Sequence, residues 1–538
     1  MATSTSLRYG EQNVEFMRSP TKVAIRSSVG HGRSMGFTIE PMFKRHPVER
    51  LGRLGRFEII DIQASESVIA NVLERLGRSS AIRSHVSVYH TSDDEVPFVP
   101  EGTIFLSFED GVSDRDIEDL LTRYDLGVAF VTKDKFYTVY SQNTDTDALQ
   151  VSRRLQDEDI VSLAEPDLVT PRQPLDIDID DKLLSRQWHL ENKGEFDGTT
   201  AGFKKGADAR VIAAWSLLGS LGEKSAVVAV IDDGVDVTHP DFQGKAIHPW
   251  DFVRGSDNVQ PAPDLNAVEA GDWHGTACAG VAVGLPGGGD IVGAIPNAKL
   301  LPVRVPDHLS PPEVEKWFQY VTEKGAWVVS CSWDAAAKCY PLPERISKAI
   351  SHCAKQGRNG KGCVVVFAAG NTGSDINDPP NSLNGFAIHP DVIAVAASTS
   401  MDRRASYSDM GKEIAVCAPS GGFPGWNIAT SDVTGTYVDA NGVERSSGYT
   451  PGAYYTEFTG TSSACPLVAG VCSLVLSANP ELITHEVRRI LEITARKIGQ
   501  ESDYQNSHSK KFGYGCVNAE AAVAMALEAK QNRDVLAS

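Results

Sequence analysis

The sequence predicts an α/β protein with a doubly wound, mostly parallel sheet and helices on both faces, preceded by a small α+β domain. Apolar strands alternate with helical segments from residue 226 onward, and these strands are nearly continuous runs of Val, Ile and Ala. Such runs are typical of strands that are covered on both faces. A proline-rich, acidic stretch separates this region from a shorter pattern of mixed strands and helices. A chain of 538 residues is also too long for one ordinary core, so we expect several domains.

Residues 1–94 carry no motif that predicts a role. They alternate Arg-rich polar stretches with short apolar ones, such as residues 57–60 and 68–73. We expect a separate N-terminal segment here, whose role the sequence leaves open.

Residues 95–170 are predicted to form the small α+β domain. Strands are expected at residues 103–108, 128–131, 136–141 and 160–163, with helices at residues 114–124 and 147–155. Ser113 is placed to cap the first of these helices. The resulting order, βαββαβ, is the ferredoxin-like arrangement. Residues 171–180 contain Pro171, Pro174 and several Asp residues, and we interpret them as an exposed linker.

Residues 181–538 are predicted to form the large α/β domain. The strands expected there are residues 226–231, 300–305, 327–331, 364–368 and 392–397. The helices expected there are residues 276–283, 312–324, 342–356, 481–495 and 518–528. Reacting groups in such sheets collect at the carboxyl ends of the strands, so we look for functional residues there.

The composition argues against several classes of function. The net charge of −19, from 51 basic and 70 acidic residues, argues against a general nucleic-acid binder. No apolar run is long enough to cross a bilayer, and the first residues lack the basic and apolar segments of a secretory signal. The nine cysteines lie between Cys278 and Cys516 and include no close pair, so they predict neither a disulfide framework nor a zinc site. We expect a cytoplasmic or otherwise intracellular protein with reduced thiols and no membrane span.

Three residues with the chemistry of a nucleophilic site fall at one edge of the predicted sheet. Asp232 ends the first strand, His274 opens a helix of small residues and Ser462 opens a later apolar helix. A serine nucleophile needs a base within hydrogen-bond reach, and the base needs a carboxylate that fixes its tautomer. Taken singly, the three are more simply interpreted as a turn residue, a surface histidine and a helix N-cap. Their order Asp, His, Ser and their flanking residues together predict a catalytic triad.

The motifs around these residues resemble those of the subtilisin-like serine proteases, over about residues 181–528. They are residues 230–234 (VIDDG), 239–241 (HPD), 274–280 (HGTACAG), 368–371 (AAGN) and 460–462 (GTS), with Pro466. The resemblance implies a serine endopeptidase that hydrolyses peptide bonds through Asp232, His274 and Ser462, with Asn371 donating a hydrogen bond to the oxyanion. Ser463 is the alternative nucleophile. Neighbouring side chains on a helix diverge by about 100°, so only one serine can face His274, and the motif puts it at Ser462.

The resemblance leans toward the kexin- and furin-like enzymes and the calcium-dependent proteases of bacteria. Asp233 directly follows the triad Asp, residues 187–190 resemble the start of the mature enzymes, and Ser332-Trp333 resembles their Ser-Trp-Gly-Pro. The resemblance implies that residues 95–170 are an inhibitory propeptide-like domain and that the protein is made as a precursor. Its partners would then be protein or peptide substrates and its own N-terminal domain.

Asp233, Ser332 and Asp334 are the expected substrate-binding residues. Asp334-Ala335 stands where Gly-Pro is usual in the family, which changes the primary specificity pocket. An anionic cleft gains charge-assisted hydrogen bonds with a cationic side chain, so we expect Arg or Lys at the cleaved bond. The alternative is that Asp334 caps a turn and that the pocket is apolar.

Asp181 and Asp241 match positions that bind calcium in kexin-like enzymes. Carboxylate oxygens suit Ca²⁺, and the Gly-rich loop at residues 285–292, which includes Asp290, could add backbone carbonyls. The alternative is a solvated acidic surface.

Two other classes of function stay open at this point. A catalytically silent binding protein could keep the fold as a scaffold, although the complete triad and Asn371 speak against it. A lipase or esterase is disfavoured because the serine lacks the Gly-x-Ser-x-Gly elbow.

Overall fold

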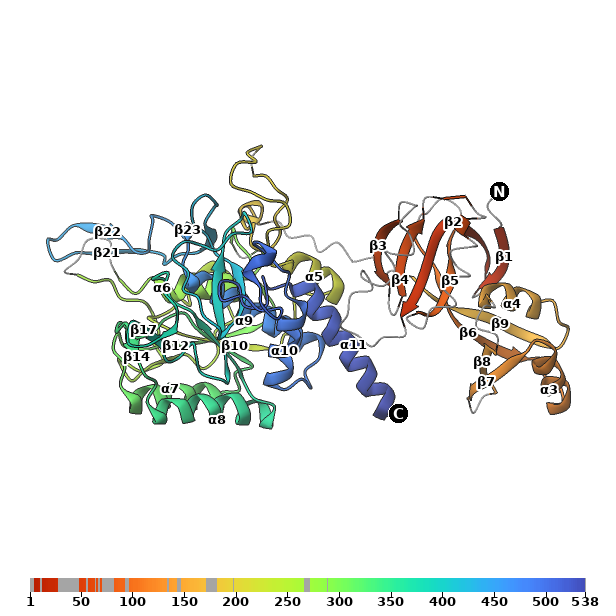
Figure 1. The fold of residues 1–538 in the computed structure, drawn as a ribbon. Coiled ribbons are helices and arrows are strands. Elements are labelled where there is room, and N and C mark those ends of the chain that lie inside the picture. The colour runs from red at the N-terminus through yellow and green to blue at the C-terminus, as the bar shows by residue number, and fades with distance from the viewer. Residues whose placement is uncertain are drawn as a thin grey trace. The chain divides into compact units, whose positions relative to one another are not determined.

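The computed structural model describes residues 4–9, 12–27, 48–54, 57–62, 64–65, 68–69, 82–91, 96–132, 135–142, 147–170, 181–196, 198–265, 271–287 and 289–537. The chain divides into two compact units, Met1–Gln173 and Pro174–Ser538. Each unit has its own sheets and its own buried cores (Figure 1).

The first five strands form one antiparallel sheet. They are β1 (Ser4–Tyr9), β2 (Gln12–Ser27), β3 (Val48–Leu54), β4 (Phe57–Ile62) and β5 (Ile82–Thr91). Their order is β1-β2-β4-β3, and β5 also pairs with β2. The apolar run at residues 57–60 lies in β4, whereas most of the run at residues 68–73 lies outside the described residues.

The next six elements alternate as β-α-β-β-α-β. They are β6 (Val99–Phe108), α3 (Asp114–Arg123), β7 (Leu126–Val131), β8 (Tyr137–Ser141), α4 (Ala148–Leu155) and β9 (Val161–Val169). The strands form an antiparallel sheet in the order β7-β8-β6-β9. Side chains cap both helices, since Ser113 Oγ accepts a hydrogen bond from Asp116 N and Asp147 accepts one from Leu149 N.

The five-stranded sheet and the βαββαβ segment are joined within one unit. Tyr89 of β5 donates a hydrogen bond of 2.6 Å to the Asp147 carboxylate that caps α4. Leu7 and Phe16 pack with Tyr89 and with Leu149 of α4 in one buried cluster. The boundary expected at residue 94 therefore lies inside a compact unit. Residues 171–180, interpreted as a linker, lie outside the described residues.

The second unit is built on a seven-stranded parallel sheet. Its order is β11 (Trp250–Asp251), β12 (Lys299–Arg304), β10 (Val227–Asp232), β13 (Val328–Cys331), β15 (Val364–Ala368), β18 (Val392–Ser398) and β19 (Ile414–Pro419). All neighbouring strands are parallel. The five strands predicted from the apolar runs are confirmed, and β11 and β19 extend the sheet at its edges.

Helices cover both faces of this sheet, as predicted. One face packs against α5 (Val211–Leu218), α6 (His274–Val283), α9 (Thr461–Ala478), α10 (Thr484–Thr494) and α11 (Ala519–Ala537). The other face packs against α7 (Pro311–Glu323) and α8 (Glu344–Gly360), which lie side by side in Figure 1. Alternate residues of β10 enter the two cores: Val228 and Val230 face one, and Ala229 and Ile231 face the other. This burial on both faces is why the strand is continuously apolar.

Short elements connect these layers. They are the strands β14 (Cys339–Tyr340), β16 (Asn377–Asp378), β17 (Ser382–Asn384), β20 (Ile428–Ser431), β21 (Thr436–Val438), β22 (Glu444–Ser446) and β23 (Tyr454–Phe458), and the 3₁₀ turns η2 (Leu184–Arg186), η3 (Pro240–Phe242) and η4 (Glu501–Asp503). The β21–β22 hairpin extends away from the body of its unit (Figure 1). The apolar patterns did not predict it, because each of its strands is only three residues long.

Helix α9 has the length and composition of a membrane-crossing helix, the one such helix in the described part of the chain. The expectation of no apolar run of that length was wrong for this stretch. However, 94% of this stretch is buried inside the fold, which is typical of the central helix of a core.

Candidate active site

Asp232 lies at the carboxyl end of the central strand β10, where the sequence placed it. Its side chain is 5% exposed. One oxygen, Oδ1, accepts hydrogen bonds from His274 Nδ1 at 2.8 Å and from the Asp233 backbone N–H at 2.9 Å. The carboxylate is therefore held in one orientation, with the imidazole as its main partner.

His274 is the first residue of α6, and its position depends on the glycine that follows it. A Cβ at Gly275 would lie 2.2 Å from the Gly234 carbonyl oxygen, so only glycine lets this helix lie so close to the end of β10. Burial alone would lower the pKa of His274, but the Asp232 carboxylate raises it well above its ordinary value. The bond to Asp232 occupies Nδ1, so in the neutral ring Nε2 is the nitrogen left to accept a proton.

Ser462 lies in the first turn of α9, and Pro466 stands four residues further on. Proline has no N–H, so the Ser462 carbonyl lacks its usual helical partner. The Ser332 hydroxyl donates to this carbonyl at 3.1 Å, and the Cys278 thiol lies 3.6 Å from it. In return, the Ser462 hydroxyl donates to the Ser332 carbonyl at 3.2 Å. Ser332 was expected to bind substrate, and in the structure it is a buried partner of the nucleophile candidate.

The two serines at the start of α9 have different surroundings. The Ser463 hydroxyl is fully buried and donates to Ser420 Oγ at 2.8 Å and to the Gly460 carbonyl at 3.1 Å. Ser462 is slightly exposed, on the side of the helix that faces Ser332. This difference agrees with the divergence of neighbouring helical side chains.

Two hydrogen-bond donors flank the space in front of Gly460. Asn371 uses its carbonyl oxygen to accept from the Thr461 N–H at 2.7 Å and from the Thr461 hydroxyl at 3.0 Å. Its Nδ2 is therefore turned the other way. A Cβ at Gly460, which has φ +88°, would lie 3.3 Å from Asn371 Nδ2 and 3.6 Å from Ser462 N. This pair of donors is suited to an oxygen that becomes negatively charged.

The Asp233 carboxylate, which was expected to bind substrate, is hydrogen-bonded to the backbone at the start of α6. Its Oδ1 accepts from the Gly275 N–H at 2.7 Å and its Oδ2 from the His274 N–H at 3.1 Å. The carboxylate thus caps the N-terminus of α6, where negative charge is favourable. Burial, together with the charge of Asp232, raises the pKa of the Asp233 carboxyl. Its observed contacts are with the backbone at the start of α6, and its predicted contact with substrate stays a prediction.

Asp334, which was expected to bind substrate, lies close to a second carboxylate, Asp409, that was not predicted. A Cβ at Gly370 would lie 2.3 Å from Asp409 Oδ2 and 3.3 Å from Asp334 Oδ2, so both acids lie beside the residue that precedes Asn371. Asp334 reaches the surface, yet partial burial and the charge of Asp409 raise its pKa to about 6. Asp409 lies 75 positions further along the chain, and no local signal pointed to it.

Asp181 and Asp290 lie near enough to Asp241 for their charges to act on it, but among the described residues the oxygens of these three acids are not all within 4.8 Å of one another, so the metal site stays a prediction. Asp241 is fully buried, and burial raises its pKa to about 7, to which the charges of Asp181 and Asp290 add. Its Oδ2 accepts from Ser431 Oγ at 2.8 Å, while Asp181 Oδ1 accepts from the Gly287 N–H at 2.9 Å. An all-oxygen set with several negative charges fits Ca²⁺.

Within the described residues, one group of His, Cys and acidic side chains has its ligand atoms within 4.8 Å of one another: Asp232, His274 and Cys278. Cys278 lies one turn after His274 on α6, and its Sγ is 3.7 Å from His274 Nδ1. Burial raises the pKa of this thiol, so it stays protonated. The group shares its atoms with the triad candidate, and we do not treat it as a separate site.

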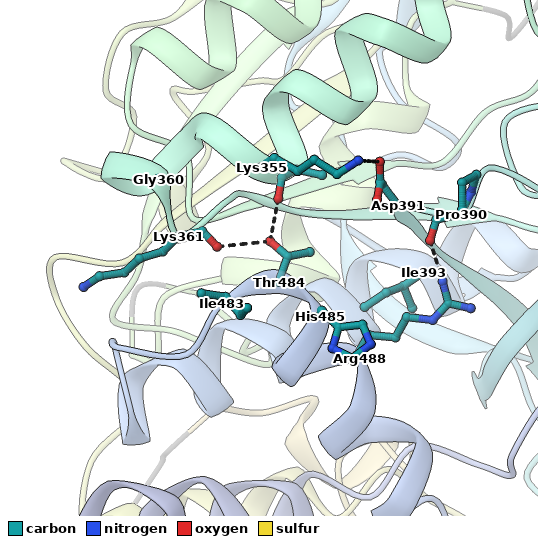
Figure 2. Close-up of a pocket in the computed structure, with 11 residues that line it drawn as sticks. Lys355, Gly360, Lys361, Pro390, Asp391, Ile393, Ile483, Thr484, His485 and Arg488 are labelled. Carbon is teal, nitrogen blue, oxygen red and sulfur yellow. Dashed lines mark hydrogen bonds and ion pairs between the residues drawn. The ribbon is translucent and has the colours of Figure 1, made fainter. Parts of the chain in front are cut away.

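A pocket of about 200 Å³ lies at the opposite edge of the sheet (Figure 2). It is lined by residues at the end of α8, the start of β18 and the start of α10. Its basic groups are already engaged: Lys355 pairs with Asp391 at 2.8 Å, and Arg488 donates to the Pro390 carbonyl at 2.9 Å. Because it adjoins the amino-terminal end of β18, this pocket is separate from the residues described above.

The chain is similar to known proteins in sequence and in fold. The sequence model of the Subtilase family matches residues 223–515. A protein named calcium-dependent protease from Nostoc sp. is 32% identical over 97% of this chain and 80% of that relative. Thermitase from Thermoactinomyces vulgaris is 31% identical over 58% of this chain and 91% of that relative. Among solved structures, the serine protease of Aeromonas sobria superposes with a TM-score of 0.54 at 21% identity, over 65% of this chain and 68% of that one, a likeness of fold alone.

Proposed function

The chain belongs to the subtilase family of serine endopeptidases, and from this premise we propose that Asp232, His274 and Ser462 hydrolyse peptide bonds as a catalytic triad. The observation that carries the proposal is the 2.8 Å hydrogen bond between Asp232 and His274 Nδ1. It holds the imidazole in the tautomer whose Nε2 can accept a proton.

The reaction begins when the Ser462 hydroxyl leaves the Ser332 carbonyl and turns to His274. Ser462 Oγ bonds to the carbonyl carbon of the substrate while its proton passes to His274 Nε2. The substrate oxygen becomes an oxyanion and accepts hydrogen bonds from Asn371 Nδ2 and the Ser462 N–H.

Collapse of this intermediate breaks the C–N bond, and His274 gives its proton to the leaving amine. A water then attacks the acyl-enzyme as His274 takes one of its protons. When the ester bond breaks, the proton returns to Ser462 and the acid product is released. The Asp232 carboxylate stabilises the imidazolium that forms twice in the cycle.

Labelling with a fluorophosphonate probe tests this assignment. We expect labelling of the wild type and of Ser463→Ala, and none of Ser462→Ala. Peptide hydrolysis should follow the same pattern, whereas a protein that binds no probe and cleaves no peptide would be a silent scaffold.

Asn371→Ala should retain labelling but lower kcat by roughly 10²–10³, the loss known for the oxyanion asparagine of subtilisin itself.

The same site supports a preference for Arg or Lys at the cleaved bond. The support is the pair Asp334 and Asp409 beside Gly370, next to the oxyanion donor Asn371. A cationic side chain entering there gains charge-assisted hydrogen bonds that a neutral one cannot make. Asp233 was expected to share this role, and its carboxylate accepts hydrogen bonds from the His274 and Gly275 N–H groups.

The first unit supports the proposal of an inhibited precursor. The edge strand β7 and its neighbour β8 expose four large apolar side chains: Val128, Phe130, Val131 and Tyr140. Phe130 is 62% exposed. Large exposed apolar side chains on an edge strand are common where a protein partner binds. We assign the partner as the catalytic unit, which the βαββαβ segment would inhibit as a propeptide.

The calcium hypothesis is also part of the proposed function. Relatives over nearly the whole chain are named calcium-dependent proteases. Asp181 and Asp241 would hold the ion, with Asp290 and carbonyls of residues 285–287 as further oxygen ligands. The ion would supply positive charge that stabilises these buried carboxylates in their ionised form.

A further inference from the structure

Residues 432–453, which we call the excursion, leave the fold after β20 and return at β23. Asp432, fully buried, ties its two ends together. Its Oδ1 accepts from the N–H groups of Val433 at 2.8 Å and Tyr449 at 2.9 Å, and its Oδ2 accepts from Thr450 N at 2.9 Å. Gly448 has φ +92°, and a Cβ there would lie 2.5 Å from Asp432 Oδ1, so the backbone before Tyr449 has little freedom.

The excursion packs against the residue that precedes the catalytic histidine. Tyr437 of β21 contacts Trp273 with ring centroids 6.4 Å apart, and Val433 completes this buried cluster. Trp273 is directly followed by His274. One side of the excursion is thus fixed on the start of α6.

Tyr449 is connected to His274 through a series of aromatic rings. Its ring stacks on Tyr455 at 4.6 Å and contacts Phe458 at 6.5 Å, and Phe458 meets the His274 ring edge-on at 5.8 Å. Phe458 is 4% exposed, whereas Tyr449 is 38% exposed. Tyr449 therefore supplies the outer, accessible surface of this series. Burial raises the pKa of its phenol, and the charges of His274 and Asp233 act on it, which agrees with a hydroxyl near the triad.

The position of His274 decides which half of a substrate would meet this surface. The acyl half lies toward Gly370 and the two acids, on the side of Asn371. The leaving amine must lie against His274 Nε2, which protonates it. Phe458 contacts the His274 ring, and the more exposed Tyr449 contacts Phe458, so these rings lie beside the base that would protonate the leaving half.

We propose that Tyr449 forms a binding surface for an apolar or aromatic side chain in the first two residues after the cleaved bond. This inference rests on the proposed triad. The ring offers a flat, half-exposed face that is held by Tyr455 and by the buried Asp432. Aromatic pairs of this kind contribute enough to change rates by about three- to tenfold.

Partitioning of the acyl-enzyme tests the inference separately from the triad. The enzyme is given an ester substrate that has no residue after the cleaved bond, together with phenylalanine amide or glycine amide. The amide competes with water for the acyl-enzyme, and the ratio of aminolysis to hydrolysis is measured for each amide. We expect the wild type to favour phenylalanine amide. Tyr449→Ala should reduce that preference about three- to tenfold with ester hydrolysis unchanged, while Tyr449→Phe should keep it. Val438→Ala, on the exposed side of the same excursion, is the matched control and should also keep it.

Three results would overturn the inference. If the wild type and Tyr449→Ala show the same preference between the two amides, with normal ester hydrolysis, this inference is overturned and the proposed triad is not. A loss of more than tenfold in ester hydrolysis by Tyr449→Ala would mean that the ring acts on the triad, not on the leaving residue. A wild type that neither hydrolyses the ester nor binds fluorophosphonate would overturn the proposed function together with this inference.

Discussion

The Ser462 carbonyl lacks its usual helical hydrogen bond because Pro466, four residues later, has no N–H to donate. The Ser332 hydroxyl takes the place of that donor at 3.1 Å, while the Ser332 carbonyl accepts the Ser462 hydroxyl. A proline in the second turn of α9 therefore links Ser462, the proposed nucleophile, to the residue that follows strand β13. This contact stabilises the fold and sets the resting position of the serine.

Ser332→Ala should destabilise the catalytic unit by about 1–3 kcal/mol, because a buried carbonyl loses its hydroxyl donor. The midpoint of urea denaturation measures this, with the exposed Ser502→Ala as the control. We expect only a small change in kcat, since the backbone of Ser332 is retained. Equal midpoints for both variants would show that the hydroxyl contributes nothing to stability.

Activity should rise with pH through the titration of His274. Only the neutral imidazole can act as a base, and Asp232 raises the pKa of His274 well above its ordinary value. The rise in kcat/KM should therefore occur at a higher pH than for an unperturbed histidine. Stability should change in the opposite direction, because the bond to protonated His274 is lost as pH rises through the folded-state pKa.

Asp232→Asn should remove the cause of this shift. It should lower the pKa of His274 and reduce kcat by about 10⁴, since the imidazolium loses its partner and the ring its tautomer. A pH–rate profile of both enzymes checks the prediction. An unshifted profile in Asp232→Asn would contradict the role given to the carboxylate.

Asp334→Asn should lower kcat/KM for substrates with Arg at the cleaved bond by about tenfold. This loss is at the low end of the range for a hydrogen bond between charged groups, because the Asp334 carboxylate is exposed. In the wild type, the preference for Arg over Leu should decline as pH falls through about 6, where Asp334 takes up a proton. Asp307→Asn, on the open surface, is the control. Preferred cleavage after Phe or Leu, insensitive to both substitutions, would end the basic-specificity proposal.

Calcium should stabilise the catalytic unit and chelation should destabilise it. An ion at 100 times its Kd adds about 2.7 kcal/mol if it binds only the folded state. Melting of the full chain with and without a chelator measures the effect, and Asp241→Asn should blunt it while the exposed Asp257→Asn should not. Identical melting curves in excess chelator would leave Asp181 and Asp241 without a metal-binding role.

A fragment of residues 1–173 should inhibit the enzyme that lacks it when the two are mixed. We choose these bounds because residues 1–173 form one compact unit, so a fragment starting at residue 95 would lose the Tyr89–Asp147 bond. Phe130→Asp should weaken inhibition at least tenfold if the exposed apolar side chains of β7 and β8 bind the catalytic unit. Undiminished peptide hydrolysis at micromolar fragment would refute the propeptide proposal.

The sequence alone determined the features that depend on local pattern. Continuous Val, Ile and Ala runs predicted the central strands, because burial on both faces of a parallel sheet leaves no polar alternation. The order of Asp232, His274 and Ser462 with their small neighbours predicted the triad, and Gly275 and Gly460 now explain why those neighbours must be small. The strands of residues 1–94 escaped prediction because their apolar runs are short and interrupted by Arg.

Only the tertiary structure decided the roles that depend on distant contacts. Asp233 and Asp334 looked alike in sequence, yet one caps α6 and the other lies at the surface beside Asp409. Ser332 exchanges hydrogen bonds with Ser462, and Tyr449, in the excursion, is connected to His274 through the ring of Phe458. A side chain's neighbours are set by how strands and helices pack, here between residues that lie 42 to 175 positions apart in the chain, and the residue's own local pattern carries no record of them.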